Sequence, residues 1–354
     1  MSPRGLDEDD IRIRRAGPSR RRTRDQPKHA SAVPARVIAV DRGRFTCRVD
    51  DRDVVAMRAG PSRRTSVVVG DDGEIVGDIS GATDALARIV RVGDRTSVLR
   101  RTADDTDPIE RIVVANAEQL VIVMSVADPG PVPRLIDRCL VAAYDGGLEP
   151  LLCLTKHDLG DAADIVAAYR PLGLRVVKVS RADGDDGFAE LRDLVGGRTS
   201  VLFGQSGVGK STLVNRLVPG ATRATGAVTS IGKGSHTSSS VVALQLPGGG
   251  WVIDTPGVRS FGLGNVTPDT LLQAFPDLQP ATVNCLPGCD HRTDAHCGLD
   301  AAVAAGIASV ERLASYRRLL GSRDGVDPAE PTGPLSPQPS NAGQSSTTVP
   351  PDRQ

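Results

Sequence analysis

The sequence predicts an α/β protein of several domains: a small N-terminal β-barrel, a mainly parallel sheet covered by helices, and a C-terminal helical region. Three observations lead to this prediction. The chain has 354 residues, which at about 150 residues per domain gives two or three domains. Short β-rich runs separated by turn residues fill residues 33–103, a pattern typical of barrels. From residue 111 onward, strand-like runs alternate with helical stretches, which is typical of parallel sheets covered by helices.

Composition and charge limit the classes of protein to which the chain can belong. Lys and Arg number 43, Asp and Glu also number 43, and 39% of the residues are hydrophobic. The net charge of zero gives no general argument for a nucleic-acid partner, so only local basic clusters can provide one. No apolar run approaches the roughly 20 residues of a membrane span, and the charged N-terminus lacks the apolar segment of a secretory signal. We therefore expect a cytoplasmic protein without a membrane partner.

Both ends of the chain are expected to be disordered. Residues 1–32 form a basic arm in which six arginines lie between Arg14 and Arg24, without a large apolar residue among them. Such a stretch cannot bury enough surface to fold, so it is either a solvated tail or a contact for RNA phosphates. Residues 322–354 contain seven Pro with many Ser, Thr and Gln, a composition typical of a disordered tail.

Residues 33–103 are predicted to form an OB-like barrel. Gly, Pro and Asp residues separate its β-rich runs, which are Val37–Val40, Phe45–Val49, Val54–Met57, Val67–Val69, Ile75–Ile79, Ala87–Val92 and Ser97–Leu99. Barrels of this type often bind oligonucleotides, and Arg36, Arg44 and Arg48 would supply positive charge for phosphates. Because Phe45 is the only aromatic residue available here for stacking on bases, a structural spacer and an RNA-binding domain both remain open.

Residues 104–265 are predicted to form a domain built on a parallel sheet, followed by a helical domain in residues 266–321. The strand candidates are Ile112–Val114, Leu120–Val126, Leu151–Leu154, Val176–Val179, Thr199–Phe203, Val241–Leu246 and Trp251–Ile253. The helix candidates are Arg134–Tyr144, Ala162–Tyr169, Phe188–Val195 and Ser211–Leu217. The helical domain is expected to end in a helical stretch, Val303–Leu320.

A phosphate-binding loop is predicted where the run ending at Phe203 meets the next helix. The pattern G-x-x-x-x-G-K-[ST] is matched by Gly204, Gln205, Ser206, Gly207, Val208, Gly209, Lys210 and Ser211, and Thr212 follows in the helix. Glycines let successive backbone N–H groups point at phosphate oxygens, and the helix N-terminus adds partial positive charge. Lys210 would reach the β- and γ-phosphates, and the Ser211 hydroxyl would bind Mg²⁺. The alternative is an ordinary glycine-rich turn.

Two later segments are candidates for sensing the γ-phosphate. Asp254-Thr255-Pro256-Gly257 follows a strand candidate, so Asp254 would hold Mg²⁺ through water and the Gly257 N–H would contact the γ-phosphate. The Gly- and Ser-rich stretch 232–240 contains Thr237, whose hydroxyl would complete the Mg²⁺ shell and release the stretch when the γ-phosphate leaves. A plain flexible loop is the alternative for this stretch.

Guanine selection is assigned to Thr155-Lys156-His157-Asp158, which resembles the [NT]-K-x-D motif at the end of a strand. Asp158 would accept hydrogen bonds from guanine N1–H and N2–H₂, a donor pair that adenine lacks. Lys156 would pack on the base or brace the phosphate loop, and Ser180 stands at the place of the last base-binding turn. Because the guanine motif precedes the phosphate loop in this chain, a circularly permuted GTPase domain is the simplest interpretation.

Cys285, Cys289, His291 and Cys297 form a candidate zinc site of three thiolates and one imidazole. This ligand set is typical of closed structural zinc sites, and Pro287-Gly288 provides the tight turn that close thiolates need. His296 competes with His291 as the fourth ligand, although its adjacency to Cys297 makes it awkward. A set of free thiols in a loop is the alternative for the whole cluster.

In this order, the motifs resemble the ribosome small-subunit-dependent GTPase family of the RsgA/YjeQ type, from about Val33 to Leu320. The resemblance rests on the barrel, T-K-H-D, G-Q-S-G-V-G-K-S, G-K-G-S-H-T, D-T-P-G and the cysteine cluster. It implies an OB-fold, a circularly permuted GTPase domain and a C-terminal helical zinc-binding domain. It also implies GTP hydrolysis stimulated by the small ribosomal subunit, contact with its rRNA, and a role in late maturation of that subunit.

The resemblance further implies that His236 is the catalytic group that orients the attacking water. Many GTPases have Gln directly after the glycine that corresponds to Gly257. This chain has Val258 there, so we predict slow intrinsic hydrolysis. We expect a monomer that binds GTP and GDP, with one zinc ion per chain. The rival interpretations are a non-hydrolysing GTP-dependent RNA-binding module and an NTP-dependent enzyme with another substrate, such as a small-molecule kinase.

Overall fold

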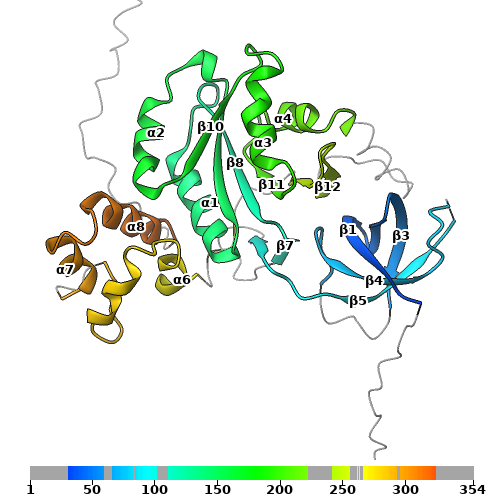
Figure 1. The fold of residues 1–354 in the computed structure, drawn as a ribbon, viewed down its shortest axis with the longest axis horizontal. Coiled ribbons are helices and arrows are strands. Elements are labelled where there is room, and N and C mark those ends of the chain that lie inside the picture. The colour runs from blue at the N-terminus through cyan, green and yellow to red at the C-terminus, as the bar shows by residue number, and fades with distance from the viewer. Residues whose placement is uncertain are drawn as a thin grey trace, which may run out of the picture.

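The computed structural model describes residues 31–59, 66–82, 84–101, 111–221, 241–255, 261, 263, 266–292 and 296–323. Within these ranges the chain forms a small barrel, a larger sheet flanked by helices, and a group of C-terminal helices (Figure 1). Among the helices described there, none has both the length and the apolar character to cross a membrane. The predicted arm and tail lie outside the described residues except at their inner ends.

The N-terminal barrel has five strands. They are β1 (Val33–Asp41), β2 (Arg44–Val49), β3 (Arg52–Arg58), β4 (Asp72–Gly77) and β5 (Ala87–Val92). Their order is β1-β2-β3-β5-β4, and β4 pairs back onto β1, which closes the barrel. Strands β3 and β5 are parallel, whereas the other neighbours are antiparallel. The predicted OB-like barrel is therefore confirmed.

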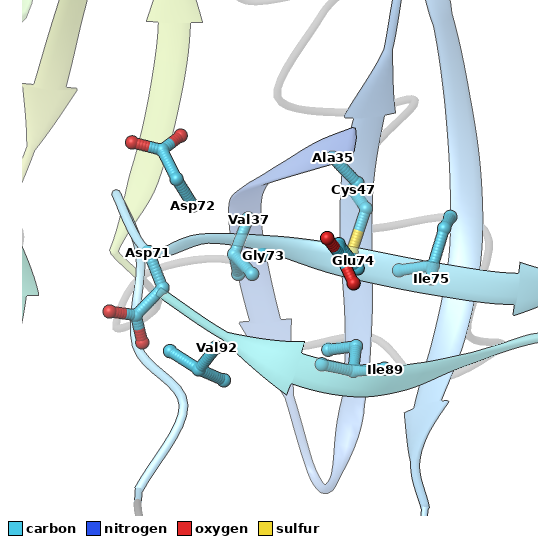
Figure 2. A pocket seen from close by; sticks show the side chains of 10 residues that line it. All are labelled: Ala35, Val37, Cys47, Asp71, Asp72, Gly73, Glu74, Ile75, Ile89 and Val92. Carbon is cyan, nitrogen blue, oxygen red and sulfur yellow. The ribbon is translucent and has the colours of Figure 1, made fainter. Parts of the chain in front are cut away.

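Apolar side chains from all five strands fill the barrel, including Phe45, Val54 and Ile89. A small cavity remains beside Cys47, and Figure 2 shows the residues that line it. Its volume of about 10 Å³ leaves room for a single water molecule at most. Among the described residues of the barrel, the interior is therefore a packed core, and this cavity has no room for a base or a nucleotide.

Two of the runs assigned to the barrel lie outside its strands. Residues 67–69 form no strand, although Val69 makes a bridge to Val114 and the Val67 side chain packs in the barrel core. The run Ser97–Leu99 enters β6 (Val98–Arg101), which pairs with β7 (Arg111–Ala115) in a separate two-stranded sheet. The buried Leu99 side chain belongs to the apolar core of the following domain, and this burial holds β6 there.

The second sheet has the order β10-β9-β8-β11-β13-β12. Its strands are β8 (Gln119–Ser125), β9 (Glu149–Thr155), β10 (Arg175–Val179), β11 (Thr199–Phe203), β12 (Val242–Gln245) and β13 (Trp251–Asp254). Neighbouring strands are parallel except for the antiparallel pair β12 and β13. Every residue of β8 and β11 is buried, as expected for central strands of a sheet covered on both faces.

Helices cover both faces of this sheet. They are α1 (Pro133–Gly146), α2 (Ala163–Tyr169), α3 (Ala189–Val195) and α4 (Lys210–Leu217), with short 3₁₀ turns η3 (His157–Leu159), η4 (Arg170–Leu172) and η5 (Asp186–Phe188). On one face, Ile122 of β8 shares an apolar cluster with Leu140 of α1. On the other face, Val123 shares a cluster with Leu191 of α3 and Leu213 of α4. Successive residues of β8 thus point to opposite faces, and each face has its own core.

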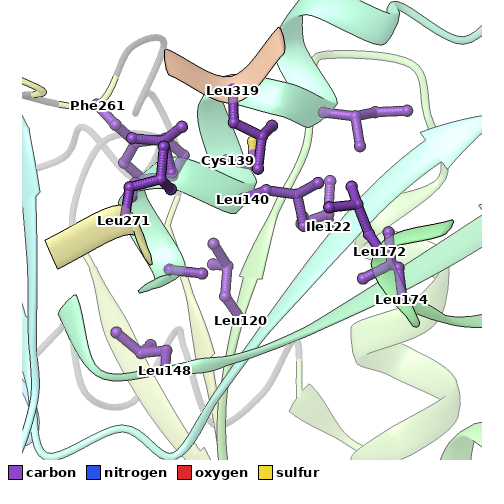
Figure 3. Close-up of a cluster of buried hydrophobic side chains, with 14 of the residues drawn as sticks. Leu120, Ile122, Cys139, Leu140, Leu148, Leu172, Leu174, Phe261, Leu271 and Leu319 are labelled. Carbon is purple, nitrogen blue, oxygen red and sulfur yellow. The ribbon is translucent and has the colours of Figure 1, made fainter. Parts of the chain in front are cut away.

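The C-terminal helices extend the core on the α1 face. They are α6 (Pro268–Leu272), η6 (Gln279–Asn284), α7 (Gly298–Ala304) and α8 (Val310–Arg323). Figure 3 shows Leu319 of α8 and Leu271 of α6 in the same cluster as Cys139 and Leu140 of α1. A polar contact reinforces this packing, because Arg312 of α8 donates a hydrogen bond of 2.9 Å to the carbonyl oxygen of Pro171.

The predicted helical stretch Val303–Leu320 is broken in the structure. Helix α7 ends at Ala304 and α8 begins at Val310. Gly306 stands between them with a φ of +70°, a left-handed conformation that ends helices and that glycine adopts readily. Both helices contact the cysteine cluster, α7 through the backbone N–H of Gly298 and α8 through Arg317.

Candidate functional site

The carboxyl ends of the parallel strands carry the predicted nucleotide motifs. Thr155 is the last residue of β9, Phe203 is the last residue of β11, and Asp254 is the last residue of β13. Because β11 pairs in parallel with both β8 and β13, and β8 with β9, these ends lie at one edge of the sheet. Ligands of open α/β sheets bind at this edge. Folding therefore brings the motifs together in spite of their unusual order in the chain.

The phosphate loop has the local structure that its sequence predicts. Residues 204–209 form the turn between β11 and α4. Gly209 precedes α4 with a φ of +92°, a conformation that residues with a side chain rarely adopt. A Cβ atom on Gly204 would lie 2.6 Å from the carbonyl oxygen of Val123. Glycine is therefore required at both positions, where it lets the backbone curl before the helix.

Lys210 connects the phosphate loop to the D-T-P-G segment. Its Nζ lies 3.2 Å from Oδ1 of Asp254 and donates a hydrogen bond, also of 3.2 Å, to the carbonyl oxygen of Thr255. The Thr255 hydroxyl donates to the carbonyl oxygen of Leu202 at 2.8 Å, which anchors this segment to β11. A cation and a carboxylate thus face each other beside the loop, where a phosphate and a hydrated Mg²⁺ would need them.

Thr155 connects the guanine motif to the phosphate loop. Its side chain is buried, and its hydroxyl donates a hydrogen bond of 2.6 Å to the carbonyl oxygen of Val208. The carbonyl oxygen of Met124 lies 3.3 Å from the same hydroxyl. Thr155 therefore braces the loop. Lys156, for which we predicted a role on the base or the loop, donates a hydrogen bond to the carbonyl oxygen of Asp128.

The loops that follow β9 and β10 are tied together at the predicted base-binding edge. Ser180 is buried and donates a hydrogen bond to the exposed carboxylate of Asp158. The Ser180 oxygen in turn accepts a hydrogen bond of 3.0 Å from the backbone N–H of Ala182. Farther out, Nε2 of His157 lies 2.6 Å from the Asp183 carboxylate. Ser180 thereby orients the group that we predicted to read guanine.

The remaining candidates for nucleotide contacts differ in how far the structure describes them. In the loop and the start of α4, Gln205, Ser206 and Ser211 are exposed, and Thr212 is half-buried. Their hydroxyl and amide groups are therefore accessible from solvent. Thr237, His236 and Gly257 lie outside the described residues, so their predicted roles stay predictions.

The four candidate zinc ligands come together in space. Nδ1 of His291 lies 3.6 Å from the sulfur of Cys285, 3.5 Å from that of Cys289 and 3.7 Å from that of Cys297. All four ligand atoms lie within 4.8 Å of one another. A tetrahedral zinc ion with its usual bond lengths to sulfur and nitrogen sets sulfur and nitrogen about 3.6 Å apart. The donor set and its spacing therefore fit zinc.

Packing favours His291 over His296 as the fourth ligand. The His291 side chain is buried, whereas His296 is exposed. Nε of Arg317 in α8 donates a hydrogen bond of 2.9 Å to the His291 carbonyl oxygen, and the backbone N–H of Gly298 donates to the Cys285 sulfur at 3.2 Å. Such outer contacts orient metal ligands. They also connect the cluster to α7 and α8.

The other three cysteines have a different environment. Cys47, Cys139 and Cys153 are buried among apolar side chains. Burial raises the pKa of the Cys47 thiol to about 12 and that of the Cys153 thiol to about 12, and it also raises the pKa of Cys139. These thiols stay protonated near neutral pH and pack against the apolar side chains around them.

Sequence reasoning alone does not find two of the contacts at this site. The hydrogen bond from Thr155 to Val208 joins positions 53 residues apart, and the pair formed by His157 and Asp183 joins positions 26 apart. Neither pair belongs to a single motif. The only signal in the sequence is that Thr, like the more common Asn, offers a hydrogen-bond donor at the first position of the guanine motif.

Comparison with protein families identifies the central part of the chain. Residues 92–264 match the family model described as RsgA GTPase. The chain is 42% identical over 196 residues to the small ribosomal subunit biogenesis GTPase RsgA of Ectopseudomonas mendocina, a match that covers 53% of this chain and 57% of that protein. It is also 42% identical over 195 residues to the protein of the same name from Marinobacter nauticus, covering 52% of this chain and 56% of that protein. The match thus spans little more than half the length of these relatives.

Solved structures resemble a larger part of the chain. The crystal structure of YjeQ from Thermotoga maritima matches with a TM-score of 0.60 and 26% identity, covering 83% of this chain and 99% of that one. YloQ, described as a circularly permuted GTPase, matches with a TM-score of 0.59, covering 84% of this chain and 98% of that one. The YloQ match, at 24% identity, concerns the fold alone. The predicted fold class is confirmed, and the predicted resemblance to the RsgA type is confirmed by the match of residues 92–264.

Proposed function

We propose that this chain, whose residues 92–264 match the family model described as RsgA GTPase, binds and hydrolyses GTP during late maturation of the small ribosomal subunit. One observation carries the proposal: three motifs that are distant in the sequence surround one site. The Thr155 hydroxyl of the guanine motif reaches the carbonyl oxygen of Val208 in the phosphate loop at 2.6 Å. Lys210 of that loop lies 3.2 Å from Asp254 of the D-T-P-G segment.

Asp158 would select guanine. Its carboxylate is exposed and held by the buried Ser180, so it can accept hydrogen bonds from guanine N1–H and N2–H₂. Adenine has no matching donor pair and would leave the carboxylate unsatisfied. Lys156 would lie against the base, and Thr155 would keep the loop under the phosphates.

Lys210 and the backbone of residues 204–209 would hold the phosphates. The Lys210 amine now pairs with Asp254, and a triphosphate would take over this cation. The hydroxyls of Ser211 and Thr237 would bind Mg²⁺ directly, and Asp254 would hold it through water. When bound, Mg²⁺ supplies positive charge that stabilises the phosphate oxygens.

Hydrolysis by the free protein is proposed to be slow. Val258 follows Gly257 in the sequence, so no glutamine stands there to orient water. His236 is our candidate for that role when a ribosomal surface contacts the protein. A His236→Ala variant tests this assignment, because equal stimulation of the variant and the wild type by small subunits would remove His236 from the mechanism.

Cys285, Cys289, His291 and Cys297 would hold one zinc ion in a structural role. The closed set of four protein ligands leaves no open position for a substrate. Bound zinc supplies cross-links between η6, α7 and the intervening turn. Because Arg317 of α8 contacts the His291 carbonyl, the ion would also stabilise the docking of α8.

The small ribosomal subunit and its rRNA are the proposed partners. Support comes from the names of the relatives, which are small ribosomal subunit biogenesis GTPases. The basic stretch Arg14–Arg24 would bind rRNA phosphates, so we expect salt-sensitive binding. We further propose that the chain acts in the cytoplasm as a monomer.

The decisive experiment measures phosphate release from GTP with and without purified small subunits, using ATP as the control nucleotide. We expect slow release from GTP alone, strong stimulation by the subunits, and little release from ATP. Tight GTP binding without phosphate release in either condition would instead identify a non-hydrolysing RNA-binding module. Preference for ATP would exclude the assignment of Asp158.

A further inference from the structure

The barrel is joined edge to edge with the nucleotide-binding sheet. Strand β1 lies beside β12 (Figure 1), and Ala39 pairs with Val242. Val242 is in turn opposite Asp254 in the pair of β12 and β13, and Asp254 is opposite Leu202 of β11. Successive pairs of opposite residues therefore connect the barrel to Asp254, whose carboxylate faces Lys210.

Arg48 of β2 clamps this junction. Its guanidinium donates a hydrogen bond of 2.6 Å to Oε1 of Gln245, and its Cζ lies 5.6 Å from the centre of the Trp251 ring. Gln245 and Trp251 are opposite each other at the far end of the β12–β13 pair. Asp53 of β3 holds the guanidinium through Nε at 2.7 Å. Asp53 in the barrel thus orients Arg48, whose guanidinium contacts both strands of the β12–β13 hairpin.

Arg36 makes a second contact between the barrel and the sheet domain. It is the cross-strand partner of Arg48, and its guanidinium donates to the carbonyl oxygen of Asn116 at 3.2 Å. It also forms an ion pair with Asp72 at 3.5 Å. Two of the three barrel arginines that we expected to bind RNA phosphates therefore have partners within the chain. Their contacts attach the barrel to the sheet from two directions.

We propose that Arg48 is a positioning residue for the nucleotide site, an inference that rests on the proposed GTPase function. Strand β12 has β13 on one side and the barrel on the other, joined to the barrel through the pair of Ala39 and Val242. Through its contacts with Gln245 and Trp251, Arg48 holds the β12–β13 hairpin in the register that places Asp254 beside Lys210. A ribosomal surface that moves the barrel would change the nucleotide site through this contact.

The test compares variants of the full-length protein that break the contact from either side. Arg48→Ala removes the cation, and Gln245→Leu removes its acceptor from a residue outside the barrel. Arg52→Ala is the matched control, because it removes the same charge from an exposed position of the same hairpin. For each variant we would measure the dissociation rate of Mg²⁺-bound fluorescent GDP, and kcat and KM for small-subunit-stimulated hydrolysis.

We expect both contact variants to release GDP about fivefold faster and to lose about fivefold in stimulated kcat, the scale of one partly exposed, charge-assisted hydrogen bond. The KM for small subunits should stay unchanged. The double variant should be no worse than Arg48→Ala alone, because that substitution already removes the hydrogen bond that Gln245→Leu breaks. Arg52→Ala should release GDP at the wild-type rate.

Three results would overturn the proposal. If Arg48→Ala raises only the KM for small subunits, Arg48 is an RNA contact. If GDP release and stimulated kcat match the wild type in both contact variants, the contact between Arg48 and the hairpin has no effect on the nucleotide site. If the double variant shows the product of the two single effects, the residues act separately. Should the wild type itself not be stimulated, the proposed function fails, and GDP release alone decides the role of Arg48.

Discussion

Replacing Thr155 by Val removes one hydroxyl group at the point where the guanine motif contacts the phosphate loop. The side chain is 5% exposed, and its hydroxyl donates to the carbonyl oxygen of Val208 at 2.6 Å. Valine has almost the same shape, so the surrounding packing is kept. The Val208 carbonyl loses a buried partner, which costs about 1–3 kcal/mol where the group cannot reach water.

The loss of nucleotide affinity depends on whether this free-energy cost arises in the free protein or only in the nucleotide-bound protein. Without nucleotide, the loop can shift and expose the Val208 carbonyl to water. With nucleotide bound, the loop must keep the shape that points its N–H groups at the phosphates. If about 1–2 kcal/mol of the cost appears only in the bound state, GDP binds about 5- to 30-fold more weakly.

Titration of the Thr155→Val protein with fluorescent GDP in the presence of Mg²⁺ measures this loss. Thr155→Ser is the matched control, because serine keeps the hydroxyl and should bind GDP within about twofold of the wild type. Thermal unfolding of the proteins without nucleotide separates a loss of affinity from a general loss of stability. Wild-type affinity in the Thr155→Val protein would refute the proposed bracing of the loop.

Three further predictions concern other contacts. Lys210→Ala should lower stimulated hydrolysis of GTP by about 100-fold or more, because it removes the cation at the phosphates; a normal kcat would exclude Lys210 from this role. Removal of zinc by a chelator should release one ion per chain and expose three reactive thiols, whereas Cys139 and Cys153 stay unreactive near neutral pH because burial raises their pKa; labelling of all six cysteines in the still-folded protein would contradict this. Arg318→Met should lower the free energy of unfolding by about 1–3 kcal/mol, because the buried Asp137 carboxylate loses a cation at 3.1 Å; restored stability in the double variant with Asp137→Asn would support this cause, and an unchanged denaturant midpoint in Arg318→Met would exclude it.

The zinc cluster shows how far spacing in the sequence can lead. Three cysteines and a histidine within a short stretch predict a metal site, and the adjacency of His296 to Cys297 favours His291 as the fourth ligand without settling the choice. The choice depended on which imidazole the chain turns inward, and the structure buries His291 and exposes His296. Burial follows from contacts with α8, which is distant in sequence from the ligands, so local spacing has no access to it.

The barrel arginines show a second limit of what a sequence can predict. Charge pattern alone suggests that Arg36 and Arg48 bind RNA phosphates, because an arginine on a strand has no visible partner in the sequence. Their partners Asn116 and Gln245 come from the following domain, 80 and 197 residues away. Electrostatic and hydrogen-bond partners at such separations depend on how the domains dock, and neither periodicity nor motif spacing encodes that docking.

What the sequence by itself determined was local: the glycines that the phosphate loop needs, the order of strands and helices, and the ligand types of the metal cluster. These depend on backbone conformation and on the spacing of apolar and polar side chains, which act over a few residues. Only the tertiary structure decided which strand ends meet, that Thr155 braces the phosphate loop, and that the barrel continues the sheet beside Asp254. Those contacts arise from the burial of apolar surface between elements far apart in the chain, so they exist only once the whole core has formed.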